Sequence, residues 1–258
     1  MIPGTAATLT GATYVYGVVP ARTVLPADAS GVGEPGADLG LVRHGPVAAV
    51  VSAVSADGAL GTRRDLLQHS RLLDAIARTT AVLPLRFGAV LADRRAVVDE
   101  LLAPRQARFA AALAALEGRA QFTVKARYVE ETVLREVVDQ EPLIAELRER
   151  LRGRPDEATW YERIQLGELV AGAVARRREA DSAALVGELG RWASSVTWRP
   201  AETEDGVVDA ALLVERVAWP SLERGVEGIA ERQAGRMRLR LLGPLAPYDF
   251  SNELMEEN

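Results

Sequence analysis

The sequence predicts an α+β protein of two domains, followed by an extended C-terminal tail. Short runs of alternating or continuous apolar residues, typical of strands, occur in both halves of the 258-residue chain. Segments with helical periodicity separate them, and the expected order in the second half is strand, helices, strand, strand, helix, strand. That order is the split βαβ arrangement of a ferredoxin-like sandwich, here with extra helices inserted after the first strand.

Turn residues mark the expected boundaries. Glu117-Gly118 closes the first half, and Gly243-Pro244 should stop the last strand, because proline has no N–H to donate to a strand ladder. We therefore expect an N-terminal mixed α+β domain over residues 1–118, a ferredoxin-like domain over 119–242 and a tail over 243–258.

The N-terminal domain should combine apolar strands with amphipathic helices. Thr62 is a suitable N-cap for a helix whose apolar stripe includes Leu66, Leu73 and Ile76. Pro84 restricts its own strand to an edge or an irregular segment. The expected strands are 13–19, 39–43, 47–54 and 82–87, and the expected helices are 62–77, 93–102 and 104–116.

The second domain begins with a strand in which apolar and polar residues alternate. Phe122, Val124, Ala126 and Tyr128 would face a covered side and their neighbours an open one, as in many antiparallel sheets. The expected strands are 121–129, 194–199, 208–216 and 236–242, and the expected helices are 131–139, 142–152, 158–192 and 220–233.

Bulk properties narrow the class of protein. The formal net charge is −5, which argues against nucleic acid as the default partner. The chain has no cysteine, no apolar run of roughly 18–20 residues for a membrane span and no signal-peptide pattern at its start. These features favour a soluble intracellular protein without a membrane partner.

No motif in the sequence assembles an active site. The glycines of residues 31–36 match G-x-G-x-x-G in letters, but prolines lie before and within the motif and a strand is expected after it, so we interpret it as a loop. His44 and His69 lack metal-ligand spacing and are interpreted as local hydrogen-bonding residues. We expect no catalytic residue, no cofactor and no metal, and hence no enzyme.

Basic residues alternate with apolar ones in the last strand of the second domain. In a ferredoxin-like sheet this strand lies beside the first, so its arginines should share one face with the basic residues of that strand. Like charges opposed across strands are destabilising unless something acidic covers them. We expect the tail to do so, with its two rings buried over this half and its acidic end near the arginines, unless the rings dock into a partner or other elements cover the face. The candidate docking or partner-contact residues are Tyr248, Phe250, Arg236, Arg238, Arg240, Lys125 and Arg127.

Segments spread along the chain resemble one known family. Tyr14–Pro20 (YVYGVVP), Val82–Gly88 (VLPLRFG) and Gly243–Phe250 (GPLAPYDF), together with residues 117–131, are similar in sequence and order to the gas vesicle protein GvpL/GvpF family. The resemblance implies two α+β domains, the second ferredoxin-like.

The resemblance also implies a function that the residues alone do not. It suggests an accessory structural or assembly protein of the gas vesicle, an intracellular, cytoplasmic buoyancy organelle. Such a protein would bind the small hydrophobic shell protein or other accessory proteins during vesicle formation, and it would not be an enzyme.

Two other functions stay open. A ferredoxin-like sheet can bind RNA, but that use needs aromatic rings on the open face, where we expect none. A small-molecule enzyme could use a cleft between the domains, although no nucleophile, base or metal cluster is visible.

Overall fold

The computed structural model describes residues 12–256 except 28, 34–36, 56–59, 200 and 202. The end of the glycine motif and Glu257 of the acidic tail lie outside this part, and the side chains of Glu253 and Glu256 are likewise not described. The chain forms two compact units, residues 1–121 with 243–258, and residues 122–242. The tail therefore belongs to the first unit.

The first unit is built on an antiparallel sheet. Its order is β2-β3-β1-β4, with β5 also paired to β1. The central strands β1 and β3 are buried along almost their whole length, because their residues are apolar on both alternating faces. The strands are β1 (Ala12–Pro20), β2 (Leu39–His44), β3 (Val47–Val54), β4 (Leu83–Pro84) and β5 (Val90–Leu91).

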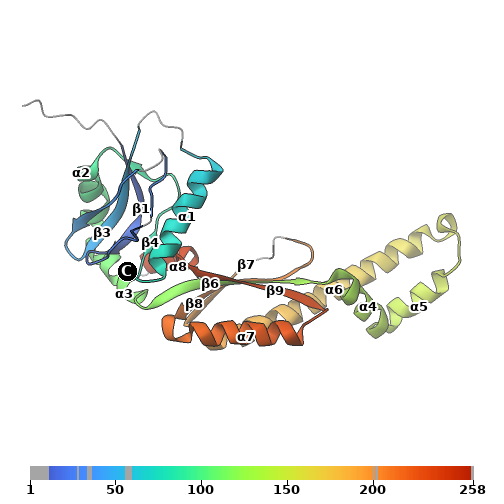
Figure 1. Cartoon of the computed structure of the whole chain (residues 1–258). Helices are drawn as coiled ribbons and strands as arrows, with labels where there is room; N and C mark the ends of the chain where they lie inside the picture. Colours follow the sequence, from blue (N-terminus) through green and yellow to red (C-terminus); the bar gives the residue numbers. More distant parts are fainter. Residues whose placement is uncertain are drawn as a thin grey trace, which may run out of the picture. The chain divides into compact units, whose positions relative to one another are not determined.

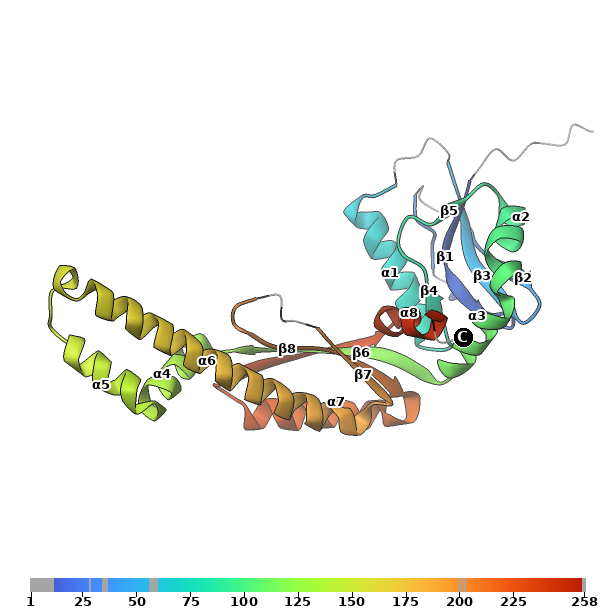
Figure 2. The same ribbon diagram turned by 180° about the vertical axis from the view of Figure 1, so that it is seen from behind.

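Helices cover both faces of this sheet. Helix α1 lies on one face, and the segment running from α2 into η1 lies on the other (Figures 1 and 2). The predicted N-cap of α1 is confirmed: Thr62 and Asp65 each accept the other's backbone N–H, a capping box. The helices are α1 (Arg63–Ala77), α2 (Arg94–Ala96), the π-helical η1 (Val97–Leu102), the 3₁₀ turn η2 (Ala103–Arg105), α3 (Gln106–Ala115) and α8 (Tyr248–Glu256).

The second unit contains a four-stranded sheet of order β7-β8-β6-β9. The predicted alternation in β6 is confirmed, since Phe122, Val124, Ala126 and Tyr128 all belong to the apolar core. The chain leaves the first unit within β6 and returns to it within β9. The strands are β6 (Arg119–Tyr128), β7 (Ser195–Arg199), β8 (Gly206–Glu215) and β9 (Met237–Leu245).

Two helices cover one face of this sheet. The second half of α6 and all of α7 lie along it, whereas α4 and α5 pack against the first half of α6, beyond the sheet (Figures 1 and 2). Leu185 and Leu189 of α6 and Leu222, Val226 and Ile229 of α7 complete the core. The helices are α4 (Glu130–Gln140), α5 (Pro142–Leu151), α6 (Trp160–Leu189) and α7 (Trp219–Arg232), with 3₁₀ turns η3 (Asp156–Ala158), η4 (Gly190–Trp192) and η5 (Arg216–Ala218).

The structure corrects two expectations about the C-terminal end. Gly243-Pro244 does not stop the last strand, because β9 continues to Leu245. Since β9 is an edge strand, a proline there can leave its missing N–H on the side without a partner strand. The tail after Pro247 is the helix α8 and not an extended segment, and proline is well tolerated where a helix begins, because the N–H it lacks needs no partner there.

A glycine in β1 sets how closely β4 can approach. A Cβ on Gly17 would lie 2.7 Å from the carbonyl oxygen of Leu83, closer than such atoms normally come. Gly17 pairs with Pro84 and follows a shift in register between β1 and β3. Close backbone approach therefore requires glycine here.

We predict that Gly17→Ala destabilises the first unit by about 1–3 kcal/mol, because the new methyl group must push two backbones apart. The matched control is Gly167→Ala, in the interior of α6, where a Cβ meets no atom within 4 Å. That change should be neutral or stabilising by up to about 1 kcal/mol. Urea denaturation of both variants checks the prediction, and equal stability would contradict it.

Candidate functional site

The imidazole of His69, on α1, has polar partners in three other segments of the first unit. Its Nδ1 lies 2.9 Å from the hydroxyl of Tyr14 in β1. Its Nε2 lies 3.2 Å from the carbonyl oxygen of Leu85 and 2.9 Å from the hydroxyl of Tyr248 in α8. One side chain thus joins the three segments that carry the family resemblance.

The partners of His69 define its tautomer. A carbonyl oxygen can only accept, so Nε2 carries the proton and donates to Leu85, with Tyr248 sharing it. Nδ1 therefore accepts from the Tyr14 hydroxyl, whose oxygen in turn accepts the Gly88 N–H at 3.1 Å. A continuous chain of hydrogen bonds results, as expected for polar groups buried this deeply.

Electrostatics in this cluster favour neutral groups. Burial raises the pKa of Tyr14 to about 12 and raises the pKa of Tyr16 as well. Burial also lowers the pKa of His69, against the smaller effect of the Leu85 hydrogen bond. Both ring nitrogens have partners within the first unit, so the cluster joins β1, the segment after β4 and α8 to α1.

The tail is attached to the first unit by further contacts. The Ala246 N–H donates to Asp74 of α1 at 2.9 Å. Gln121 and Asp249 bond reciprocally, with the Asp249 N–H donating to the Gln121 amide oxygen at 3.1 Å and the amide N–H to the Asp249 carboxylate at 2.5 Å. The Phe250 side chain is 2% exposed and Tyr248 is 36% exposed.

The predicted docking place of the tail is therefore wrong. Tyr248 and Phe250 do not lie over the basic strands of the second half; they belong to the first unit, with Tyr248 bonded to His69. The physical reason is that His69 and Asp74 present buried polar atoms that need partners, which the tail supplies.

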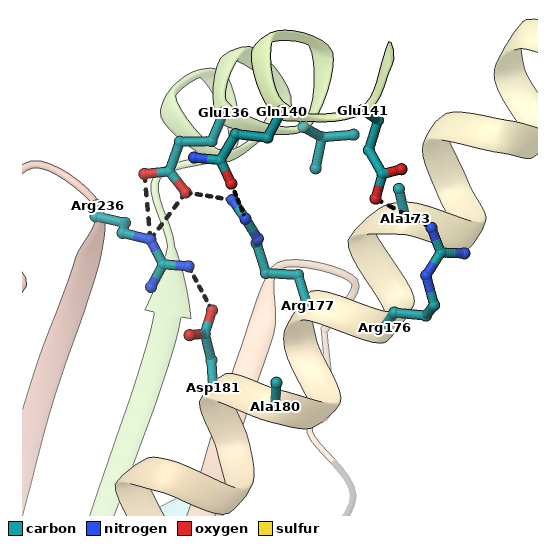
Figure 3. A pocket seen from close by; sticks show the side chains of 10 residues that line it. Glu136, Gln140, Glu141, Ala173, Arg176, Arg177, Ala180, Asp181 and Arg236 are labelled. Atoms are coloured by element: carbon teal, nitrogen blue, oxygen red, sulfur yellow. Dashed lines mark hydrogen bonds and ion pairs between the residues drawn. The ribbon is translucent and has the colours of Figure 1, made fainter. Parts of the chain in front are cut away.

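The second unit has a hollow of about 600 Å³ among α4, α6 and the residue that precedes β9 (Figure 3). Arg236 lines this hollow, with Nε 3.0 Å from Glu136 and Nη2 2.5 Å from Asp181. Arg177 bonds the same Glu136 at 2.8 Å, and Arg176 bonds Glu141 at 3.2 Å. Charges of both signs alternate around the hollow and compensate each other.

A tyrosine of β6 connects this charged cluster to the sheet. The Tyr128 hydroxyl donates to Asp181 at 2.5 Å, and the guanidinium of Arg236 lies 5.6 Å from the Tyr128 ring centre. Burial, followed by the hydrogen bond to Asp181, raises the pKa of Tyr128. The cluster holds α4, α6 and the sheet together, and its carboxylates are occupied by arginines.

The structure separates the basic residues that the sequence grouped on one face. Arg236 turns toward the helices and meets Asp181 and Glu136. Lys125 lies on the opposite face of the sheet, 2.9 Å from Asp209. Arg127, Arg238 and Arg240 are exposed, and within the described part of the chain no ion pair involves them.

Asp209 in β8 is the residue that the sequence reasoning missed. It is buried, lies directly opposite Arg199 in β7 and bonds its guanidinium at 3.0 Å, besides Lys125. Its signal was present as a single carboxylate within an otherwise apolar strand. Asp209 supplies a negative charge beside Lys125.

Among the described residues, no three His, Asp or Glu side chains come together in a group that could hold a metal ion. Over the same residues, no helix combines the length and the apolar character needed to cross a membrane.

These two clusters each join elements that are distant in sequence. Comparison with known families gives the class directly: the model described as "Gas vesicle synthesis protein GvpL/GvpF" matches residues 12–252. The chain belongs to the GvpL/GvpF family of gas vesicle synthesis proteins, and the resemblance seen in the sequence is confirmed.

Individual relatives agree with this assignment. The chain is 31% identical to gas vesicle protein F of Streptomyces sp. (strain CB03234), over 92% of this chain and 98% of the relative. It is 27% identical to gas vesicle protein F of Microcystis aeruginosa (strain PCC 7806), over 78% and 82%. These similarities support an accessory role in gas vesicles.

Solved structures show the same fold. The crystal structure of the gas vesicle protein GvpF from Anabaena sp. PCC7120 superimposes with a TM-score of 0.81 at 25% identity, over 93% of this chain and 98% of that one. The GvpF structure from Microcystis aeruginosa gives a TM-score of 0.74 at 24% identity, over 94% and 99%. The α+β architecture predicted from the sequence is thereby confirmed.

We predict that acid destabilises the first unit through His69. Because its pKa is lowered in the folded state, the unfolded chain takes up the proton first, and the free energy of unfolding should fall as the pH drops below about 6.5. His69→Gln removes the titrating group and should flatten the pH dependence between pH 7 and 5. The control His44→Gln, which leaves the cluster intact, should keep it. Thermal unfolding of the wild type and both variants between pH 7 and 5 checks the prediction. The same dependence of stability on pH in all three proteins would contradict it.

We also predict that Phe250 contributes strongly to stability. Phe250→Ala should lower the free energy of unfolding of the first unit by about 3–5 kcal/mol, because a fully buried ring is lost. Tyr161→Ala, which removes a 73% exposed ring from α6, should change stability by less than about 0.5 kcal/mol. Chemical denaturation measures both, and a small effect at Phe250 would show that the tail is dispensable.

Proposed function

We propose that this protein acts in gas vesicle formation by binding the small hydrophobic shell protein, other accessory proteins or both, and that it does so without catalysing a reaction. The observation that carries the proposal is the family match over residues 12–252. Its place of action would be the gas vesicle inside the cell.

Exposed apolar side chains support a binding role. Leu143 on α5 and Trp160 and Tyr161 at the start of α6 are between 68% and 73% exposed. Large rings left in water mark surfaces that bind other proteins more often than ordinary surface does. The exposed Arg127, Arg238 and Arg240 are the members of the expected contact set that a partner could still reach, and we retain them as a proposed contact.

The second unit fits a ferredoxin-like sandwich with inserted helices. The strand order β7-β8-β6-β9, with helices on one face, is the order such a fold requires when β6 is its first strand. A rigid sheet of this kind would serve as a scaffold that presents α4, α5 and α6, and no catalytic step is needed for that task.

Deleting the gene from a vesicle-forming host should abolish or deform the vesicles, and the wild-type gene supplied in trans should restore them. Electron microscopy and flotation measure the result. A host that forms normal vesicles without this gene and without a paralogue would overturn the proposal.

A further inference from the structure

The outer side of α1 forms one wall of an open groove in the first unit. The groove has a volume of about 770 Å³ and lies between α1 and residues 26, 29 and 30 of the loop that follows β1. Leu67, Leu72 and Ala75 of α1 and Pro26 and Ala29 of the loop supply its apolar lining. Because residues 67, 71 and 75 follow each other at a spacing of four, they lie along one side of the helix.

Arginines line the same groove. Arg63, Arg64 and Arg71 are exposed, and within the described part of the chain no carboxylate pairs with them. This contrasts with the charged hollow of the second unit, where Arg236 and Arg177 have carboxylate partners. In a chain of net charge −5, a basic groove of this kind is a local feature that a partner could recognise.

The groove is preformed, because its two walls are tied together. The side-chain amide of Gln68 donates to the carbonyl oxygens of Ser30 and Gly31 at 3.2 and 2.6 Å and contacts the Ser30 hydroxyl at 2.8 Å. Beyond this point the Val32 N–H donates to the buried Tyr16 hydroxyl at 2.6 Å. A partner therefore does not have to order Ser30 and Gly31 before it binds.

We infer that this groove binds an acidic amphipathic helix of a protein partner. A purely apolar partner would leave the arginines facing an apolar surface, which is unfavourable, and a purely anionic one would leave Leu67 uncovered. A helix with one apolar stripe and carboxylates beside it satisfies both requirements. From Arg63 to Ala75 the wall measures roughly 18 Å at 1.5 Å per residue, which accommodates about three turns of such a helix.

This inference deepens the proposed function, since it takes the ligand to be a protein and assigns it a surface. The contact should be driven partly by apolar burial and partly by charge. Exposed ion pairs are individually weak and are screened by salt. Binding should therefore weaken as the salt concentration rises and should depend on both the arginines and the leucine.

A synthetic peptide tests the groove on the full chain. The probe is a fluorescein-labelled 16-residue helix with leucine at alternating spacings of three and four and glutamate elsewhere, and its binding is followed by fluorescence anisotropy. We expect saturable binding that falls at least tenfold in the double variant R64E/R71E and severalfold in L67Q. The control R86E/R105E reverses two exposed arginines of the first unit that do not line the groove, and it should bind like the wild type.

Comparison probes separate the alternatives. The same peptide with lysine in place of glutamate, or with serine in place of leucine, should bind at least tenfold more weakly. Absence of binding by the acidic peptide, equal binding by R64E/R71E, or tighter binding of a single-stranded RNA oligomer that is insensitive to L67Q would each overturn the inference.

A complementation experiment distinguishes failure of the groove from failure of the proposed function. In the gene-deletion host, R64E/R71E should not restore vesicles, whereas R86E/R105E should. If both variants restore vesicles as well as the wild type does, the groove is not the contact and the proposed function stands. If the deletion has no effect on vesicles, the proposed function itself fails, and the peptide measurements still judge the groove.

Discussion

The need to satisfy the buried imidazole of His69 organises the first unit. An unpaired polar group at such a position costs about 1–3 kcal/mol, so each ring nitrogen must meet a partner. Tyr14 meets one nitrogen, and Leu85 and Tyr248 meet the other. These partners come from the start, the middle and the end of the chain, so a single ring fixes where β1, the segment after β4 and α8 must lie. The tail is held in the first unit by this constraint and by its bonds to Asp74 and Gln121.

In the second unit, buried carboxylates also need partners, and basic side chains supply them. Asp209 is buried within β8 and lies between Lys125 and Arg199, so the cost of removing its charge from water is offset on both sides. At the edge of the sheet, Asp181 and Glu136 share Arg236, and Glu136 also binds Arg177. In both clusters a strand is joined to elements that are distant in sequence. Charged residues here determine which elements pack together, although the core beneath them is apolar.

The sequence predicted those features that depend on residues close to one another in the chain. Helix α1 was expected because Thr62 can cap it and its apolar residues recur with helical spacing, and both features are present. The rule that proline ends a strand failed in β9. Proline ends a strand only where its missing N–H would face a neighbouring strand, and β9 is an edge strand. The sequence alone does not show which strands lie at an edge. The place of the tail also escaped prediction. Tyr248 bonds His69, which lies 179 positions earlier in the chain. The residues around Tyr248 in the sequence do not indicate that His69 is its partner.

The family segments and the exposed surfaces have separate roles in this chain. Tyr14, Leu85, Gly88 and Tyr248, which lie in the segments that identify the family, form the hydrogen-bonded cluster around His69, so most of their polar atoms are committed within the first unit. We propose that a partner binds elsewhere. The outer side of α1 is suited to this, because its inner side already carries His69 and Leu73 into the core while its outer side presents Arg64, Leu67 and Arg71 to solvent. One helix thus anchors the tail on its inner side and leaves its outer side available for binding, so a change on the outer side can alter partner recognition without disturbing the fold.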